Sequence, residues 1–161
     1  MKTLSRQRGA YMVEFAIVAA VLFLLLFGVF EIGRFFWTLN TLNEMTRRGA
    51  RLAAVCPIDH PDVARVAVYN NPGDGSTSPI LNNLTAANID VRYLDVDGVA
   101  TASYTLAEFV AVSITNYPHT LLIPFISADV ATIQMPPVTA TLPTESLGYI
   151  PDFDSRQCFG T

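Results

Sequence analysis

Apolar residues fill one unbroken stretch near the start of the chain, residues 10–30, with the sequence AYMVEFAIVAAVLFLLLFGVF. Glu14 is the only charged residue among these 21. A helix of this length rises about 31 Å, which matches the ~30 Å hydrocarbon core of a bilayer. No polar face interrupts it, as expected of a helix that lipid surrounds. The pattern predicts a single membrane-spanning helix.

A second pattern follows the span, where apolar or small residues recur at spacings of three and four, typical of one helix face. The stripe consists of Ile32, Phe35, Leu39, Leu42, Thr46, Gly49, Ala53 and Cys56. It predicts that the same helix continues to about Val55. Because the stripe ends in small residues, a sheet is expected to approach the helix closely near Gly49 and Ala53.

All ten prolines lie at or beyond Pro57, so the rest of the chain is expected to form strands and loops. The patterns predict a helix over residues 61–69, a loop over 70–79, strands at 89–93 and 110–114, and a third strand over 131–142 that Pro136-Pro137 interrupts. Asp97-Gly98 is expected to close the first strand as a hairpin turn. The predicted fold class is α+β, with a long N-terminal helix packed on a small antiparallel sheet.

The flanks of the apolar stretch indicate its orientation. Lys2, Arg6 and Arg8 precede it without any acidic residue, and cations are retained on the cytoplasmic side of a membrane. The N-terminus is therefore expected inside and the bulk of the chain outside. At the far end, Glu31 and Arg34 are spaced to pair where the helix leaves the lipid.

Two other interpretations of the apolar segment fit less well. A cleaved secretory signal peptide needs small residues at two positions after the apolar run, where this chain alternates glycines with Phe30 and Phe35. A buried core helix would have to be enclosed by the ~105 residues that follow the long helix, which are too few for so apolar a rod.

The charge and the motif content exclude several classes of function. A net charge of −4 argues against a nucleic-acid partner, which needs clustered cations. The sequence has no nucleophile elbow, phosphate loop or zinc signature, and His60 and His119 are isolated and expected in loops or on the surface. Asp95-Val-Asp97-Gly98 lacks the later Glu of a calcium loop, so a hairpin is favoured. We therefore expect no enzyme, no cofactor and no metal.

Glu14 requires an explanation, since a charge within lipid costs about 2.5–3.5 kcal/mol on insertion scales. Cleavage after Gly9 would give Ala10 a free ammonium group four residues before Glu14, on the same helix face. This ammonium could pair with Glu14 of its own chain or, in a bundle of such helices, of a neighbour. A buried pair of this kind specifies register more than it adds stability.

The sequence around Glu14 resembles a known processing site. Residues 8–15, RGAYMVEF, are similar to the site of class IVb prepilins, which has a Gly, four residues, a Glu and then an aromatic residue, here Phe15. Roughly residues 8–55 resemble the N-terminal region of TadE-like proteins, the pseudopilins or minor pilins of the tight-adherence (Tad) pilus. Ala20 stands where those proteins usually carry a proline, so a straighter helix is expected and any step that depends on a kink is in doubt.

The resemblance implies a prepilin that a dedicated prepilin peptidase cuts between Gly9 and Ala10, with Glu14 and Phe15 serving recognition and assembly. The mature chain would join or prime a Tad (Flp-type) pilus used in surface adherence and biofilm formation. Its partners would be other pilins or pseudopilins and the assembly platform in the bacterial inner membrane. The implied segments are a leader (1–9), the transmembrane half of the helix (10–30), its outer half (31–56) and the outer domain (57–161).

An alternative is a single-span anchor with a partner- or ligand-binding outer domain that is never processed. Under processing, loss of Lys2, Arg6 and Arg8 lowers the basic residues from 10 to 7 against 14 acidic ones, and the net charge becomes −7.

Two features of the outer part of the chain leave alternatives open. Cys56 and Cys158 are the only cysteines, both placed where an oxidising compartment permits a disulfide, although two unpaired buried thiols would also fit. Arg47, Arg48 and Arg51 form a basic patch that is either a partner contact or a solvated helix face. Lipid headgroups are not expected there, because Arg47 lies about 25 Å beyond the span on an upright helix.

Overall fold

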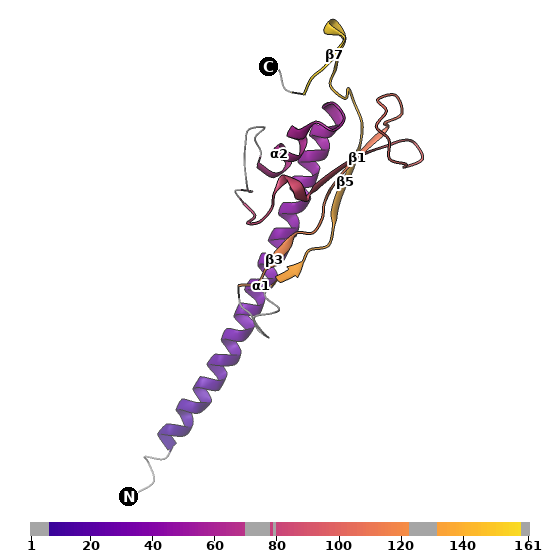
Figure 1. Ribbon diagram of the computed structural model, residues 1–161. Helices are drawn as coiled ribbons and strands as arrows, with labels where there is room; N and C mark the ends of the chain where they lie inside the picture. The colour runs from indigo at the N-terminus through magenta and orange to yellow at the C-terminus, as the bar shows by residue number, and fades with distance from the viewer. Residues whose placement is uncertain (1–6, 70–77, 79, 123–131, 159–161) are drawn as a thin grey trace, which may run out of the picture.

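The computed structural model describes residues 7–69, 78, 80–122 and 132–158. One long helix, α1 (Gln7–Val55), runs through most of the length of the molecule, and the segment with β7 extends beyond its upper end (Figure 1). The strands and the second helix lie along its upper half, and its lower half extends away from them. The helix therefore has two environments, as the change of pattern near residue 31 predicted.

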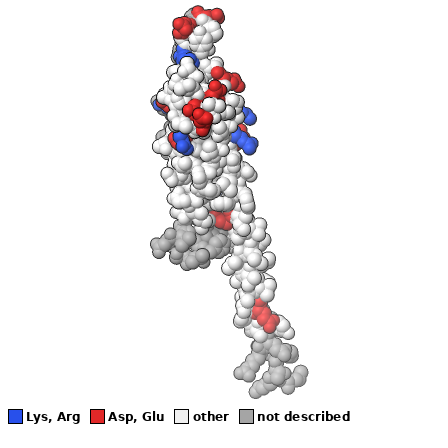
Figure 2. Space-filling view, turned by 90° about the vertical axis from the view of Figure 1, so that its right-hand side faces the viewer, with Lys and Arg blue, Asp and Glu red and all other residues white. Residues whose placement is uncertain are grey.

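The lower half of α1 is exposed and apolar. Its most apolar window has a mean hydropathy of 2.8, and only 6% of that window is buried inside the molecule. Figure 2 shows charged side chains gathered over the upper part of the visible face, while the described part of the lower helix is mostly uncharged. By length and composition, this half of the helix can cross a membrane.

The outer half of α1 packs on a three-stranded antiparallel sheet with strand order β1-β2-β5. The strands are β1 (Ile89–Leu94), β2 (Phe109–Ile114) and β5 (Val138–Pro143). The central strand β2, which lies between β1 and β5 and packs on α1, buries five of its six residues. The α+β fold class predicted from the sequence is confirmed.

Shorter elements complete the outer domain. They are α2 (Pro61–Tyr69), the 3₁₀ turns Ala86–Asn88 (η1) and Pro151–Phe153 (η3), and two small ribbons, β3 (Pro118–Thr120) with β4 (Thr132–Gln134) and β6 (Tyr149–Ile150) with β7 (Ser155–Arg156). The bounds of α2 are those predicted. The loop expected over 70–79 falls, except for Ser78, outside the described residues.

The predicted third strand is divided into two strands that belong to different sheets. Met135 lies between β4 and β5, and Pro136-Pro137 follow it without backbone N–H groups for a continuous ladder. As a result β4 pairs with β3, whereas β5 pairs with β2. The Asp97-Gly98 turn is confirmed, with Gly98 at φ +78°, but the chain returns to β1 through a single bridge between Leu94 and Ala100.

Gly49 is where α1 comes closest to its neighbours. A Cβ at this position would lie 3.0 Å from the Ala67 Cβ of α2 and 3.1 Å from the Val112 Cγ1 of β2. Both contacts are tighter than normal van der Waals packing, so only glycine fits without a shift. The close approach predicted from the small end of the stripe is therefore confirmed, and it involves both a strand and a helix.

The C-terminal end of α1 is capped by segments that are distant in sequence. The last carbonyls of a helix have no partner within it and must find one elsewhere. Here the bonds are Tyr93 Oη to the Ala53 carbonyl (3.2 Å), the Glu145 N–H to the Ala54 carbonyl (2.9 Å) and Ser146 Oγ to the Val55 carbonyl (3.4 Å). Burial raises the pKa of Tyr93 to about 12, so its hydroxyl stays protonated and can donate.

Candidate functional site

The residues of the predicted processing site lie in the first turns of α1. Because α1 begins at Gln7, both Gly9 and Ala10 are helical. A Cβ on Gly9 would have no neighbour within 4 Å. The side chains that follow are also open, with Met12 76% and Phe15 75% exposed. The described part of the molecule therefore leaves this site fully accessible.

Glu14 projects from the exposed half of α1, four residues after Ala10. No ion pair or hydrogen bond joins it to any residue that the structure describes. The leader cations Lys2 and Arg6 lie outside the described residues, as does the side chain of Arg8. Within the described residues, the intact fold therefore supplies Glu14 with no partner.

Ala20 lies within α1, which continues without interruption from Gln7 to Val55. An alanine retains the backbone N–H that a proline would lack, so the helical hydrogen-bond ladder can pass through this position. The expectation of a straighter helix agrees with this continuous ladder.

The point where α1 meets the outer domain is built around Glu31. Its carboxylate accepts a hydrogen bond from Arg34 Nη1 at 2.7 Å, which confirms the pair predicted from their spacing. Its second oxygen accepts from the Leu122 N–H at 3.4 Å, and Arg34 Nη2 donates to the Thr120 carbonyl at 3.4 Å. Glu31 is only 7% exposed. This pair thus holds the segment after β3 against the helix.

His119 joins the same junction, and its predicted surface position is wrong. The side chain is 3% exposed, with Nδ1 3.3 Å from Thr38 Oγ1 and Nε2 3.7 Å from Glu31 Oε1. The Phe35 ring meets the imidazole edge-on at 5.8 Å between centroids. Burial, and then the Arg34 charge, lower the pKa of His119, while Glu31 opposes them. His119 is therefore a neutral packing residue of the junction.

Sequence reasoning missed His119 because the only signal was its place in a short segment, Pro118–Thr120, without a periodic pattern. The other histidine, His60, is half-buried and lies 3.8 Å from Asp62, at the start of α2. Among the described residues, no group of three or more His, Cys, Asp or Glu side chains could hold a metal ion.

Cys56 and Cys158 form a disulfide, with their Cα atoms 4.5 Å apart. The bond ties the chain's tail to the residue that follows α1. Gly148 reinforces the connection, because a Cβ there would lie 2.7 Å from the Pro57 ring. The predicted pairing is confirmed, and the alternative of two free thiols is wrong.

An exposed apolar helix that carries one acid and continues into an α+β outer domain fits a membrane-anchored protein. Residues 9–51 match the family model of TadE-like protein. The N-terminal segment is thus similar to TadE-like proteins, as the motif around Glu14 indicated. No curated protein and no solved structure matches the chain.

Proposed function

We propose that this chain is a pseudopilin or minor pilin of a Tad pilus, processed between Gly9 and Ala10 and assembled through α1. The observation that carries the proposal is Glu14, a carboxylate on the apolar, exposed half of α1 that has no ion-pair or hydrogen-bond partner among the described residues. A family match over residues 9–51 supports it. No catalytic role is assigned to the outer domain.

The proposed step supplies the missing cation. Hydrolysis of the Gly9–Ala10 peptide bond adds water, leaves a carboxylate on Gly9 and gives Ala10 a free amine that is protonated at neutral pH. In lipid, an ammonium and a carboxylate attract strongly, since little water screens them. When helices pack side by side, the ammonium of one chain can also meet Glu14 of the next. Such pairing would fix the axial register of neighbouring subunits.

The proposed orientation has the N-terminus in the cytoplasm and the outer domain beyond the bacterial inner membrane. The basic leader supports it, because cations stay on the cytoplasmic side. The disulfide supports it as well, because an oxidising compartment is needed to keep the bond formed. In an assembled pilus the outer domain would then face outward, where a role in surface adherence is open to it.

Mass spectrometry of the membrane-extracted protein tests the processing step. A chain that begins at Ala10 supports the proposal. An intact Met1 in cells that hold an active prepilin peptidase would contradict it and favour an unprocessed anchor. Gly9→Phe should abolish the cut, because a bulky side chain would block the scissile position. Gly33→Phe is the matched control, since Gly33 also has no neighbour within 4 Å and lies far from the cut.

Glu14→Ala separates cleavage from assembly. The variant chain should still be cut so that it begins at Ala10, and its mass should differ from that of the mature wild type only by the substitution. The amount of this subunit recovered in sheared surface pili should fall at least about tenfold. Glu44→Ala removes an exposed acid from the outer half of α1 and should not change either quantity. Normal pilus incorporation of the Glu14→Ala chain would refute the proposed amine–carboxylate pair.

A further inference from the structure

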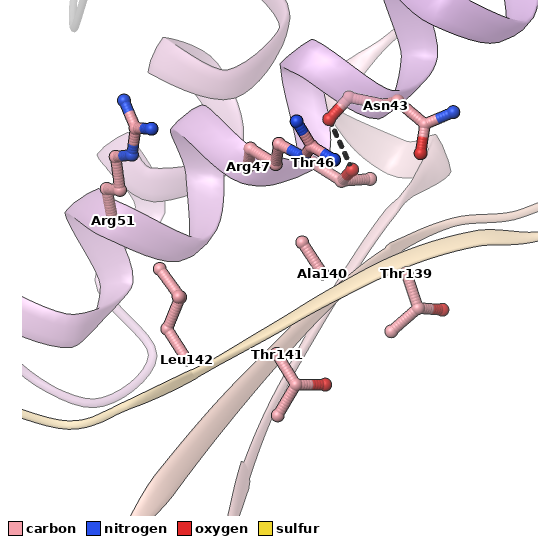
Figure 3. A pocket seen from close by; sticks show the side chains of 8 residues that line it. All are labelled: Asn43, Thr46, Arg47, Arg51, Thr139, Ala140, Thr141 and Leu142. Atoms are coloured by element: carbon pink, nitrogen blue, oxygen red, sulfur yellow. Dashed lines mark hydrogen bonds between the residues drawn. The ribbon is translucent and has the colours of Figure 1, made fainter.

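A groove of about 450 Å³ runs between the outer half of α1 and strand β5 (Figure 3). Asn43, Thr46, Arg47 and Arg51 line one side, and Thr139 to Leu142 line the other. In the close-up, Ala140 and Leu142 point toward the helix, whereas Thr139 and Thr141 point away. The floor of the groove is therefore apolar, and its helical wall carries two guanidinium groups.

Strand β5 is an edge of its sheet, with β2 on one side only. The Thr144 N–H donates to the Glu108 carbonyl, so alternate residues along β5 (Leu142, Ala140 and Val138) direct their backbone groups toward β2. The backbone groups of Thr139 and Thr141 then face the open side. Pro143 falls on the same outward register, where its missing N–H costs no ladder bond. Within the part of the chain that the structure describes, the edge is thus a short row of donors and acceptors without a strand partner.

Arg47 and Arg51 have no counter-charge among the described residues, and neither has Arg48 beside them. Other arginines of the outer part do have partners, as with Arg34 on Glu31 and Arg92 on Asp90 at 2.9 Å. An acidic, extended segment could pair both with these cations and with the β5 edge, neither of which has such a partner among the described residues.

The spacing of the two arginines matches that of a strand. Residues four apart on a helix are separated by about 6 Å along its axis. Side chains on one face of a strand recur about every 6.6–6.8 Å. A strand added to β5 would direct every second side chain toward α1, as Ala140 and Leu142 are directed. Carboxylates at alternate positions of that strand would then face Arg47 and Arg51.

We propose that this groove binds an extended segment of a partner protein, which adds a strand to the free edge of β5 and places acidic side chains two residues apart against Arg47 and Arg51. Backbone hydrogen bonds to Thr139 and Thr141 supply the affinity, and the arginines select the acidic pattern. The inference concerns the outer domain alone and does not depend on processing after Gly9.

A pair of synthetic peptides tests the geometry with the full-length chain in lipid nanodiscs. The probe is acetyl-Thr-Val-Asp-Val-Asp-Val-Thr-amide, with its acids on one strand face. The control, acetyl-Thr-Val-Asp-Asp-Val-Val-Thr-amide, has the same composition and charge but directs its acids to opposite faces. We expect the probe to bind at least about tenfold more tightly and to slow hydrogen exchange at the Thr139 and Thr141 amides.

Variants of the chain test the two walls of the groove separately. Arg47→Gln combined with Arg51→Gln should weaken probe binding at least about tenfold, whereas Arg48→Gln, one residue outside the groove lining, should change it less than about twofold. Thr141→Pro removes one outward N–H and should also weaken binding. Unchanged thermal unfolding of each variant shows that the fold is retained.

Three results would overturn the proposal. Equal binding of the two peptides would mean that charge alone attracts them. If hydrogen exchange at the Thr139 and Thr141 amides slowed as the protein concentration increased, without peptide, the groove would be assigned to a second copy of this chain. Binding of phosphatidylglycerol vesicles that requires Arg47 and Arg51, while the probe does not need these arginines, would make the patch a lipid contact.

Discussion

The buried side chain of His119 is expected to make the stability of the outer domain depend on pH. Its pKa lies below the ordinary value of 6.5 in the folded protein, because burial and Arg34 disfavour the charged form. Below about pH 6.5 the unfolded chain therefore binds a proton that the folded chain does not. Stability is full above that pH and is lost as the pH falls toward the folded-state pKa, by up to about 1.4 kcal/mol per pH unit.

The measurement is the free energy of unfolding of the outer domain between pH 7.5 and 5.5, compared with a His119→Gln variant. The variant should show a flatter pH dependence, since glutamine does not titrate. His60→Gln is the control, because His60 is only half-buried and near Asp62. Identical slopes for the wild type and His119→Gln would show that this histidine does not control the pH response.

Gly49 limits how large a side chain α1 tolerates at its closest contact. Gly49→Leu should lower the free energy of unfolding by about 1–3 kcal/mol, because overpacking forces Ala67 or Val112 to shift. Gly33→Leu, with no neighbour within 4 Å, should leave it unchanged or raise it slightly through helix propensity. Thermal unfolding of both variants checks the contrast, and equal melting temperatures would contradict the close packing at Gly49.

At this scale, local spacing predicted only the contacts that depend on it. The Glu31–Arg34 pair was predictable because the two residues are three apart on a helix. The close approach of other elements to Gly49 was predictable because the apolar stripe ends in small residues. His119 lies 88 positions after Glu31 in the sequence and reaches it through a ribbon of three-residue strands. No periodic pattern is long enough there to reveal which face is buried.

At the scale of elements, the two halves of α1 differ in how much their side chains contribute to the stability of the outer domain. Leu42 is 1% exposed in the core, whereas Leu22 is 53% exposed on the apolar half. Leu42→Ala should destabilise the outer domain by about 2–5 kcal/mol, because it leaves a cavity between the helix and the sheet. Leu22→Ala should leave the outer domain's stability within about 0.5 kcal/mol of wild type.

Hydrogen exchange at the amides of β2 in nanodiscs measures both effects, since β2 is the central strand. Faster exchange in Leu42→Ala alone is expected. If Leu22→Ala accelerated exchange equally, the halves of α1 would be energetically coupled, and their division into lipid-facing and core-facing parts would be wrong.

Long elements were predictable and short ones were not. Residues 7–55 and 61–69 carry enough turns for helical periodicity to show, and β1 and β2 each have six residues. The two-residue strands β6 and β7 have no readable pattern. The sequence predicted an interruption at Pro136-Pro137, but the change of partner from β3 to β2 depends on contacts far along the chain.

For the whole molecule, the disulfide decides whether the tail remains attached to the end of α1. The Cys56–Cys158 bond closes a loop with a sequence separation of 102, and the chain-entropy model assigns up to about 4.7 kcal/mol to a loop of that size. Segments of the same tail also cap the helix through Glu145 and Ser146. Losing the bond therefore weakens the outer domain and the end of the helix together.

Replacing both cysteines, Cys56→Ala with Cys158→Ala, avoids an unpaired thiol and should lower the free energy of unfolding by about 2–4 kcal/mol. Addition of reductant should then destabilise the wild type but not the double variant. Retention in carbonate-washed membranes should be unchanged, since it depends on the apolar half of α1, which lies away from the disulfide. A double variant as stable as the wild type would mean that the tail's hydrogen bonds and the packing of Gly148 on Pro57 hold it without the covalent link.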